Sequence, residues 1–148
     1  MTWFNTGPGL EPTYILNGFA WESLGNGVVV DVGGSHGAVC IAIARRFPSL
    51  CCIVQDRPEI VKLGRANLSS DLTNRVSFME HDFFTEQPVK SADVFYFRWI
   101  LHDWSDKYAI RILKALIPAL KCGARIIINE HILPEPGALP TYQERFLR

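Results

Sequence analysis

The sequence lacks an excess of charge of either sign and lacks any long apolar run. Its 148 residues carry 15 Lys and Arg against 15 Asp and Glu. A balanced chain without a like-charge block has no electrostatic footprint for nucleic acid or an anionic membrane. No apolar stretch approaches the ~18 residues that span a bilayer, and the first residues lack the basic and apolar blocks of a signal peptide. We therefore expect a cytoplasmic protein that binds neither nucleic acid nor a membrane.

Cysteine is scarce, and its spacing favours neither a metal site nor disulfides. The four cysteines include no C-x-x-C pair, and the four histidines add no ligand set at zinc-site spacing. The adjacent Cys51 and Cys52 would point to opposite faces of a strand. We expect buried free thiols, no metal, and structural or rim positions for His36, His81 and His131.

Apolar residues make up 48% of the chain, enough to bury the core of one domain. Short continuous apolar runs are typical of strands buried on both faces, and they predict strands at residues 28–32, 51–55, 76–79, 93–97 and 125–129. Helices are predicted over about 35–47, 58–68 and from Ser105 to Pro118. This alternation predicts an α/β fold with a doubly wound, mostly parallel sheet. Residues 1–27 form a lead-in with a short helix within 14–24, and 28–148 form the domain.

A glycine-rich turn, Asp-Val-Gly-Gly-Ser-His-Gly at residues 31–37, follows the first predicted strand. Glycines permit unusual backbone angles and let main-chain amides approach a ligand. The dinucleotide fingerprint Gly-x-Gly-x-x-Gly fits at only one of its three glycine positions, which disfavours NAD. The spacing of S-adenosylmethionine (SAM) binders matches Asp31, Gly33 and Gly37, with Ser35 in place of the middle glycine. Taken alone, the turn could also be a tight connection without a ligand.

Polar and aromatic residues follow the ends of other predicted strands, and in a parallel sheet these ends share one edge. Asp56 lies 19 residues after Gly37, where an acid can accept hydrogen bonds from both ribose hydroxyls. Its alternative is an acid at the N-terminus of the next helix. Asp82 offers a carboxylate to an exocyclic amine and Phe83 an aromatic face to a purine. Taken singly, Phe83 and Phe84 could equally belong to the core.

Five ordered segments resemble the class I SAM-dependent O-methyltransferases, specifically the plant and fungal group that acts on phenolic small molecules. They are Asp-Val-Gly-Gly-Ser-His-Gly (31–37), Gln-Asp-Arg-Pro (55–58), His-Asp-Phe-Phe (81–84), Arg-Trp-Ile-Leu-His-Asp-Trp-Ser-Asp (98–106) and Asn-Glu (129–130). The resemblance implies a Rossmann-like methyltransferase fold, SAM as cofactor and a small hydroxylated aromatic substrate, in secondary metabolism.

The same resemblance implies a role for each matching position. The turn at Gly33, Gly34 and Gly37 would contact the methionine part of SAM, and Asp56 would hold the ribose. Asp31 would be a further residue of the cofactor site. The adenine would be enclosed by Asp82, Phe83, Arg98 and Trp99. His102 would be the general base, and Glu130 one of two acids that orient it. A histidine can take the proton of a phenol during attack, although His102 could instead be structural, bonded to Asp103 or capping the Ser105 helix.

The chain also departs from the family it resembles. Family members are longer, with an N-terminal helical region that forms a homodimer, and this region is not found here. The sequence stops before the expected position of the second orienting acid and of the last strands, so we expect a truncated domain with an exposed C-terminal sheet edge and weak or no turnover. The alternative function is a non-catalytic fragment that binds SAM or S-adenosylhomocysteine (SAH), or a partner of a full-length relative.

Overall fold

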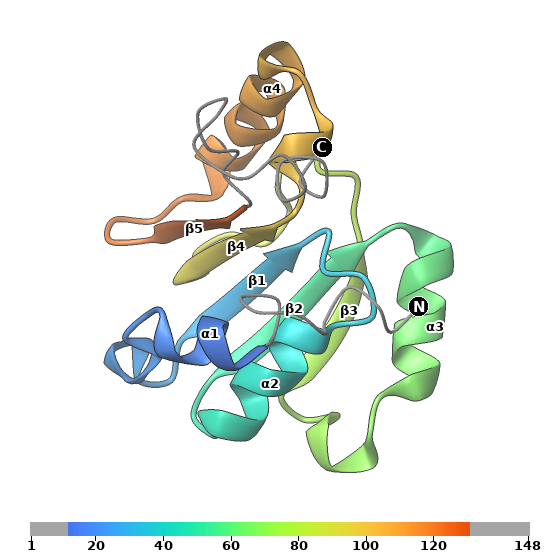
Figure 1. The fold of residues 1–148 in the computed structure, drawn as a ribbon, viewed down its shortest axis with the longest axis vertical. Coiled ribbons are helices and arrows are strands. Elements are labelled where there is room, and N and C mark those ends of the chain that lie inside the picture. Colours follow the sequence, from blue (N-terminus) through green and yellow to red (C-terminus); the bar gives the residue numbers. More distant parts are fainter. Residues whose placement is uncertain (1–11, 131–148) are drawn as a thin grey trace, which may run out of the picture.

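The computed structural model describes residues 12–130, which form one parallel five-stranded sheet with helices on both faces (Figure 1). Its strands are β1 (Val28–Val32), β2 (Cys51–Asp56), β3 (Val76–Glu80), β4 (Val94–Arg98) and β5 (Arg125–Asn129), in the order β3-β2-β1-β4-β5. The predicted fold class is confirmed, and no strand boundary differs from its prediction by more than one residue. The strand order reverses at β1, so the crevice at its carboxyl end is the place where doubly wound sheets bind ligands.

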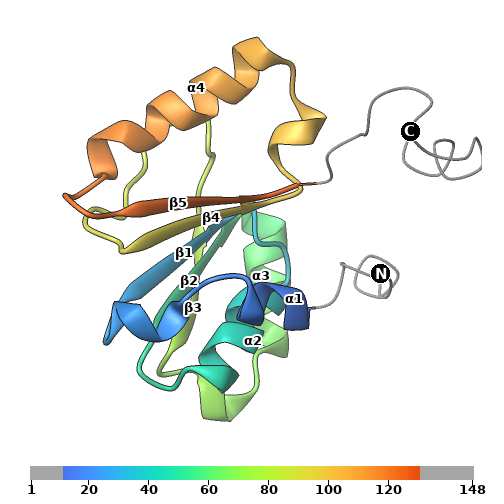
Figure 2. The same ribbon diagram turned by 60° about the vertical axis from the view of Figure 1, so that its left-hand side comes forward.

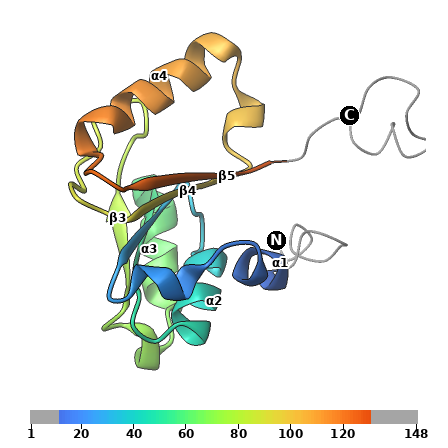
Figure 3. The same cartoon turned by 90° about the vertical axis from the view of Figure 1, so that its left-hand side faces the viewer.

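Three helices, α1 (Pro12–Asn17), α2 (Ala38–Arg46) and α3 (Pro58–Asn67), lie on one side of the sheet, and α4 (Asp106–Leu116) lies on the other (Figures 2 and 3). Short 3-10 helices are η2 (Trp21–Leu24), η3 (Ser70–Leu72), η4 (Leu101–Asp103) and η5 (Ile117–Ala119). Helix α4 ends just before Pro118, as predicted, because proline removes a main-chain donor. The single helix predicted within residues 14–24 is instead two short ones, α1 and η2.

Helix α2 begins three residues later than predicted. Ser35 and Gly37 have φ angles of 53° and 78°, which are left-handed and cannot belong to a right-handed helix. Ser105 takes the N-cap position of α4 as predicted, but its side chain makes no capping hydrogen bond.

Alternate residues of the central strands pack into two hydrophobic cores, one on each face of the sheet. Val29, Val54 and Tyr96 pack towards α1, α2 and α3, together with the fully buried Trp21. Val30, Val32, Phe95 and Phe97 pack towards α4 against Ile112 and Leu116. Burial on both faces is therefore confirmed for β1 and β4.

Strand β5 does not follow this pattern. Ile127 packs against the first core, but Ile126 and Ile128 are 40% and 49% exposed. Within residues 12–130, β5 is an edge strand and α4 lies over β1 and β4, so one face of β5 stays uncovered.

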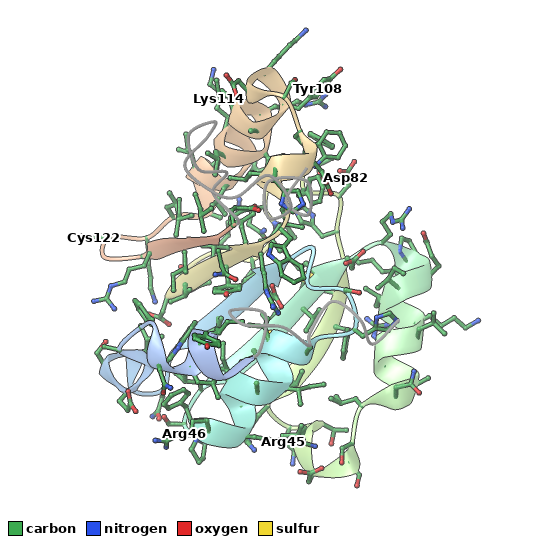
Figure 4. All side chains as sticks on the ribbon, in the orientation of Figure 1. Arg45, Arg46, Asp82, Tyr108, Lys114 and Cys122 are labelled. Atoms are coloured by element: carbon green, nitrogen blue, oxygen red, sulfur yellow. The ribbon has the colours of Figure 1, made fainter. Side chains whose placement is uncertain are left out.

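The four cysteines are free thiols, but the prediction that they are buried is correct only for Cys40 and Cys52 and wrong for Cys51 and Cys122. Cys40 and Cys52 are buried, whereas Cys51 and Cys122 are exposed, so neighbours on β2 do face opposite ways. Cys122 lies across the molecule from Asp82 (Figure 4). None of the helices between residues 12 and 130 has the length and apolar character to cross a membrane.

Candidate functional site

The glycine-rich turn leaves β1 at the switch in strand order. Gly33 and Gly37 have φ angles of 74° and 78°, and Ser35, where the SAM spacing expects glycine, has a φ of 53°. At Gly34, a Cβ atom would lie 2.5 Å from Asp31 Oδ2, so only glycine lets the turn pass over that carboxylate. The turn therefore needs its glycines for conformation at Gly33 and Gly37 and for space at Gly34.

The main-chain amides of this turn are held by the end of β2. The Gln55 carbonyl oxygen accepts hydrogen bonds from the N–H groups of Gly33 (2.8 Å) and Gly34 (3.0 Å). Asp56 Oδ2 accepts one from the Ser35 N–H at 2.8 Å. These three amides point to β2 and not to a ligand, which corrects the expectation that the glycines serve to present them. The contacts fix the shape of the turn instead.

Asp31 is a buried acid beneath the turn, with only 2% of its surface exposed. Burial raises the pKa of Asp31 to about 7, against the opposing effect of the Arg98 guanidinium. Cys40 Sγ lies 3.9 Å from Asp31 Oδ2. A cationic group that entered beside Asp31 would stabilise its ionised form.

Two hollows meet at the turn, and Gly33 and Ile100 line both. The larger, of about 770 Å³, is also lined by Asp56, Asp82, Phe83 and Trp104, among others. The smaller, of about 470 Å³, contains Asp31, Gly34, Ser35, Arg98 and Trp99. Because they share Gly33 and Ile100 as lining residues, the hollows are neighbours at the carboxyl edge of β1, β2 and β4. The four residues expected around an adenine are divided between the hollows, Asp82 and Phe83 in one and Arg98 and Trp99 in the other.

Asp56 fits both roles that the sequence leaves open, an acid at the start of the next helix and a ligand of the ribose. Its Oδ1 accepts a hydrogen bond from the Arg57 N–H at 2.8 Å, as an acid at the start of α3 would. Its carboxylate also lines the larger hollow and holds Ser35. Each carboxylate oxygen has two acceptor positions, so both can still accept a ligand hydroxyl.

Aromatic rings form the wall of the larger hollow. Phe83 and Phe84 are packed edge to face, with their ring centroids 5.0 Å apart. The ring centroid of Trp104 lies 6.0 Å from that of Phe83 and 4.7 Å from that of Phe84. Tyr108 extends the cluster from α4, 5.9 Å from Trp104. Asp82 precedes these rings and lies on the same side of the molecule as Tyr108 (Figure 4). Sequence reasoning assigned no role to Trp104 or Ile100, although both stand in the segment 98–106.

Trp99 adopts a left-handed backbone conformation directly after β4, with φ of 54°. The Arg98 guanidinium lies over its ring, 4.3 Å from the centroid. Bulky residues adopt such angles at a cost of about 1–3 kcal/mol, and such strain clusters at functional sites.

His102 and Glu130 are brought together although 28 residues separate them. His102 Nδ1 lies 2.8 Å from Glu130 Oε2. Glu130 Oε1 accepts hydrogen bonds from the N–H groups of Ile100 (2.9 Å) and Leu101 (2.8 Å), which fixes the carboxylate against η4. Oε2 is buried and receives no aligned hydrogen bond from the described residues, so its 2.8 Å contact with His102 Nδ1 is an ion-pair distance without hydrogen-bond alignment.

The other ring nitrogen of His102 has an acidic neighbour. Nε2 lies 3.3 Å from Oδ1 of the exposed Asp103, so the Asp103 contact that the sequence offered as an alternative is present as well. His102 is not among the residues that line the two hollows, although it follows Ile100 by only two residues.

The remaining histidines lie at the edges of the site. His81 lines the larger hollow, where burial lowers its pKa, and His36 lines the smaller one. His131 falls outside the described residues. Between residues 12 and 130, no three His, Cys, Asp or Glu side chains gather in a way that could hold a metal ion.

Comparison with known proteins assigns this arrangement to a family. The profile of a family described as an O-methyltransferase domain matches residues 9–146. The chain belongs to this O-methyltransferase family. Over 150 aligned residues it is 54% identical to the grayanic acid biosynthesis cluster O-methyltransferase of Cladonia grayi, an alignment that covers all of this chain and 33% of the relative. It is 41% identical to the chlorophenol O-methyltransferase of Trichoderma longibrachiatum, covering 98% of this chain and 32% of that protein.

Solved structures agree with this O-methyltransferase family assignment. Human N-acetylserotonin methyltransferase in complex with SAM matches with a TM-score of 0.77 and 26% identity, over 91% of this chain and 38% of the other. A chain described as a pericyclic reaction enzyme matches with a TM-score of 0.73 and 29% identity, over 87% and 39% of the two chains. The fold therefore also serves other chemistry. The chain spans about a third of the length of the curated relatives it matches.

Proposed function

We propose that this O-methyltransferase-family chain binds SAM in the two neighbouring hollows. Asp31, buried beside the smaller hollow, suits the cationic end of an amino acid, and Asp56, at the larger hollow, suits ribose hydroxyls. The aromatic wall of Phe83 and Trp104 suits a purine. SAM carries all three of these groups: an ammonium, ribose hydroxyls and a purine.

We further propose that the reaction is methyl transfer to a hydroxyl group of a small aromatic molecule. The His102–Glu130 contact of 2.8 Å carries this proposal, because it gives the family's site an oriented base. Bound SAM would supply the methyl group on an electrophilic sulfonium. The names of the chlorophenol and grayanic acid relatives support a phenolic substrate and a role in secondary metabolism.

In this proposal His102 Nε2 takes the proton of the substrate hydroxyl as the oxygen attacks. Glu130 holds the Nδ1–H tautomer and stabilises the imidazolium that forms, as a triad acid does. Asp103 must leave Nε2 for the substrate to reach it, and its exposure permits this. General base catalysis of this kind contributes about 10²–10⁴-fold to a rate.

The test is a methyl-transfer assay with labelled SAM and a panel of phenols, comparing the chain with His102→Asn. Asparagine cannot take the proton, so turnover should fall by at least about 10²-fold while SAH binding, measured by calorimetry, stays constant. Equal turnover in both proteins would refute the role of His102.

A second candidate function is cofactor binding without turnover. The position of His102 outside the two hollows favours it. SAH binding with no methylated product from any phenol would select this candidate, and absence of binding would exclude both.

A further inference from the structure

Two buried glutamines lie outside the groups that would touch a ligand. Gln55, on β2, and Gln87, in the loop between β3 and β4, are only 1% and 3% exposed. Gln55 Nε2 donates to Gln87 Oε1 at 2.7 Å, and Gln87 Nε2 donates back to Gln55 Oε1 at 2.8 Å. The two side-chain amides thus form a reciprocal pair, and Gln55 Nε2 also lies 3.4 Å from Met79 Sδ.

Gln87 is itself held from two directions. Its N–H donates to the Ala115 carbonyl of α4 at 3.0 Å, and its Oε1 also accepts the N–H of Val89 at 3.1 Å. The first contact anchors the backbone of Gln87 to α4, and the second ties its side-chain amide to its own loop. Gln55, in turn, meets a partner that cannot rotate freely.

The backbone of Gln55 carries the glycine turn. Its single carbonyl oxygen accepts both the Gly33 and Gly34 N–H groups, and the next residue, Asp56, accepts that of Ser35. A hydrogen bond weakens steeply as its angle departs from linear, so a carbonyl shared by two donors must keep one orientation. Any rotation of Gln55 changes both contacts together.

Fold stability alone does not require amides at these positions. Replacing both partners of a buried hydrogen-bonded pair by apolar groups of similar shape is often nearly neutral. What the pair adds is direction, because two amides meet in one geometry whereas apolar side chains pack in several.

We propose that the Gln55–Gln87 pair is a positioning element for the glycine turn. It holds the Gln55 carbonyl where that oxygen binds Gly33 and Gly34, and through the turn it sets the affinity for the cofactor. The second half of this inference rests on the proposed function.

The test compares the chain with the double variant Gln55→Met and Gln87→Met, which keeps side-chain length and removes both amides. Amide hydrogen exchange, followed by NMR, reads the turn directly. Exchange at Gly33 and Gly34, relative to Val30 in β1, should rise at least about tenfold, and the Kd for SAH should rise by a similar factor. Val94→Ala is a buried change at the opposite end of the sheet. It should alter neither the exchange at Gly33 and Gly34 relative to Val30 nor the Kd for SAH.

An unchanged exchange ratio in the folded double variant would overturn the proposal, and so would an equal rise in Val94→Ala. If the double variant does not fold, Gln87→Asn, which withdraws the amide by one methylene, must loosen the same two glycines. Failure of the parent chain to bind SAH would remove the cofactor proposal but not the positioning role, which the exchange ratio then decides alone.

Discussion

Asp31 offers a direct test, because its ionisation should lower the stability of the fold and strengthen cofactor binding. Burial raises its pKa from 3.8 in the unfolded chain to about 7 in the folded one. Between these values the folded state binds one more proton than the unfolded state, so stability falls as the pH rises. A difference of roughly three pKa units corresponds to about 4 kcal/mol, lost between about pH 4 and 7.

The perturbation is Asp31→Asn, which keeps the size of the side chain but cannot ionise. Urea unfolding at pH 5 and pH 8 should show the parent chain losing a large part of this 4 kcal/mol, whereas the variant should lose much less. Asp93→Asn is the matched control. Partial burial acts to raise the pKa of Asp93, but the Lys121 ammonium and the Val28 N–H lower it overall. Its contribution is therefore lost at acid pH, and this variant should keep the parent's loss between pH 5 and 8.

The same Asn substitution should weaken cofactor binding. If the ionised carboxylate holds the ammonium group of SAH, affinity in the parent should rise as the pH rises through about 7. At pH 8 the Kd of Asp31→Asn should be at least about tenfold higher, a difference of about 1.4 kcal/mol. A variant that keeps the parent's pH dependence of stability would refute the buried-charge argument. One that binds SAH with the parent's affinity would refute the role of Asp31 in binding.

Three further outcomes follow from the site. Glu130→Gln keeps an acceptor for the Ile100 and Leu101 amides but presents an NH₂ group or a neutral oxygen to His102. Turnover should therefore fall about 10²-fold, and the Kd for SAH should change little. Both are measured on the same preparation. Ser35→Val should destabilise the fold by about 1–2 kcal/mol in urea, because a β-branched residue tolerates its φ of 53° poorly, whereas Ser35→Gly should not. Trp104→Leu removes ring contacts worth about 0.5–1.5 kcal/mol each, and the Kd for SAH in calorimetry should rise up to about tenfold.

The sequence predicts the strands well because their apolar runs are short, continuous and bounded by turn residues. It places the start of α2 too early, because helical spacing gives no sign that Ser35 and Gly37 are left-handed. Burial of β5 on both faces does not follow from its run of isoleucines, since burial depends on which element lies over a strand. Within the described residues nothing covers Ile126 and Ile128.

The candidate site shows the same division. Residues next to strand ends, such as Asp56 and Glu130, can be found from topology alone, because parallel strands gather them at one edge. Topology alone cannot predict which of the two hollows each residue lines, because that depends on the direction of its side chain. Arg98, for example, lines the same hollow as Asp31 and not that of Asp82. The Gln55–Gln87 pair gives no sequence signal at all, because each glutamine stands singly and 32 residues separate them.

Buried polarity in the described residues is concentrated around one feature. Asp31, Gln55 and Gln87 are the buried side chains that carry a carboxylate or an amide. Asp31 lies directly beneath Gly34, Gln55 holds Gly33 and Gly34 through its carbonyl, and Gln87 holds Gln55. Burial of such groups costs free energy unless each is paired. Asp31 has a long contact with Cys40 Sγ, at 3.9 Å, and the attraction of the Arg98 guanidinium offsets only part of the effect of its burial. The free-energy cost of burying polar groups therefore falls at the turn and not in the cores on either side of the sheet. The turn is the place where a site that holds a charged, polar ligand in one position would require such groups.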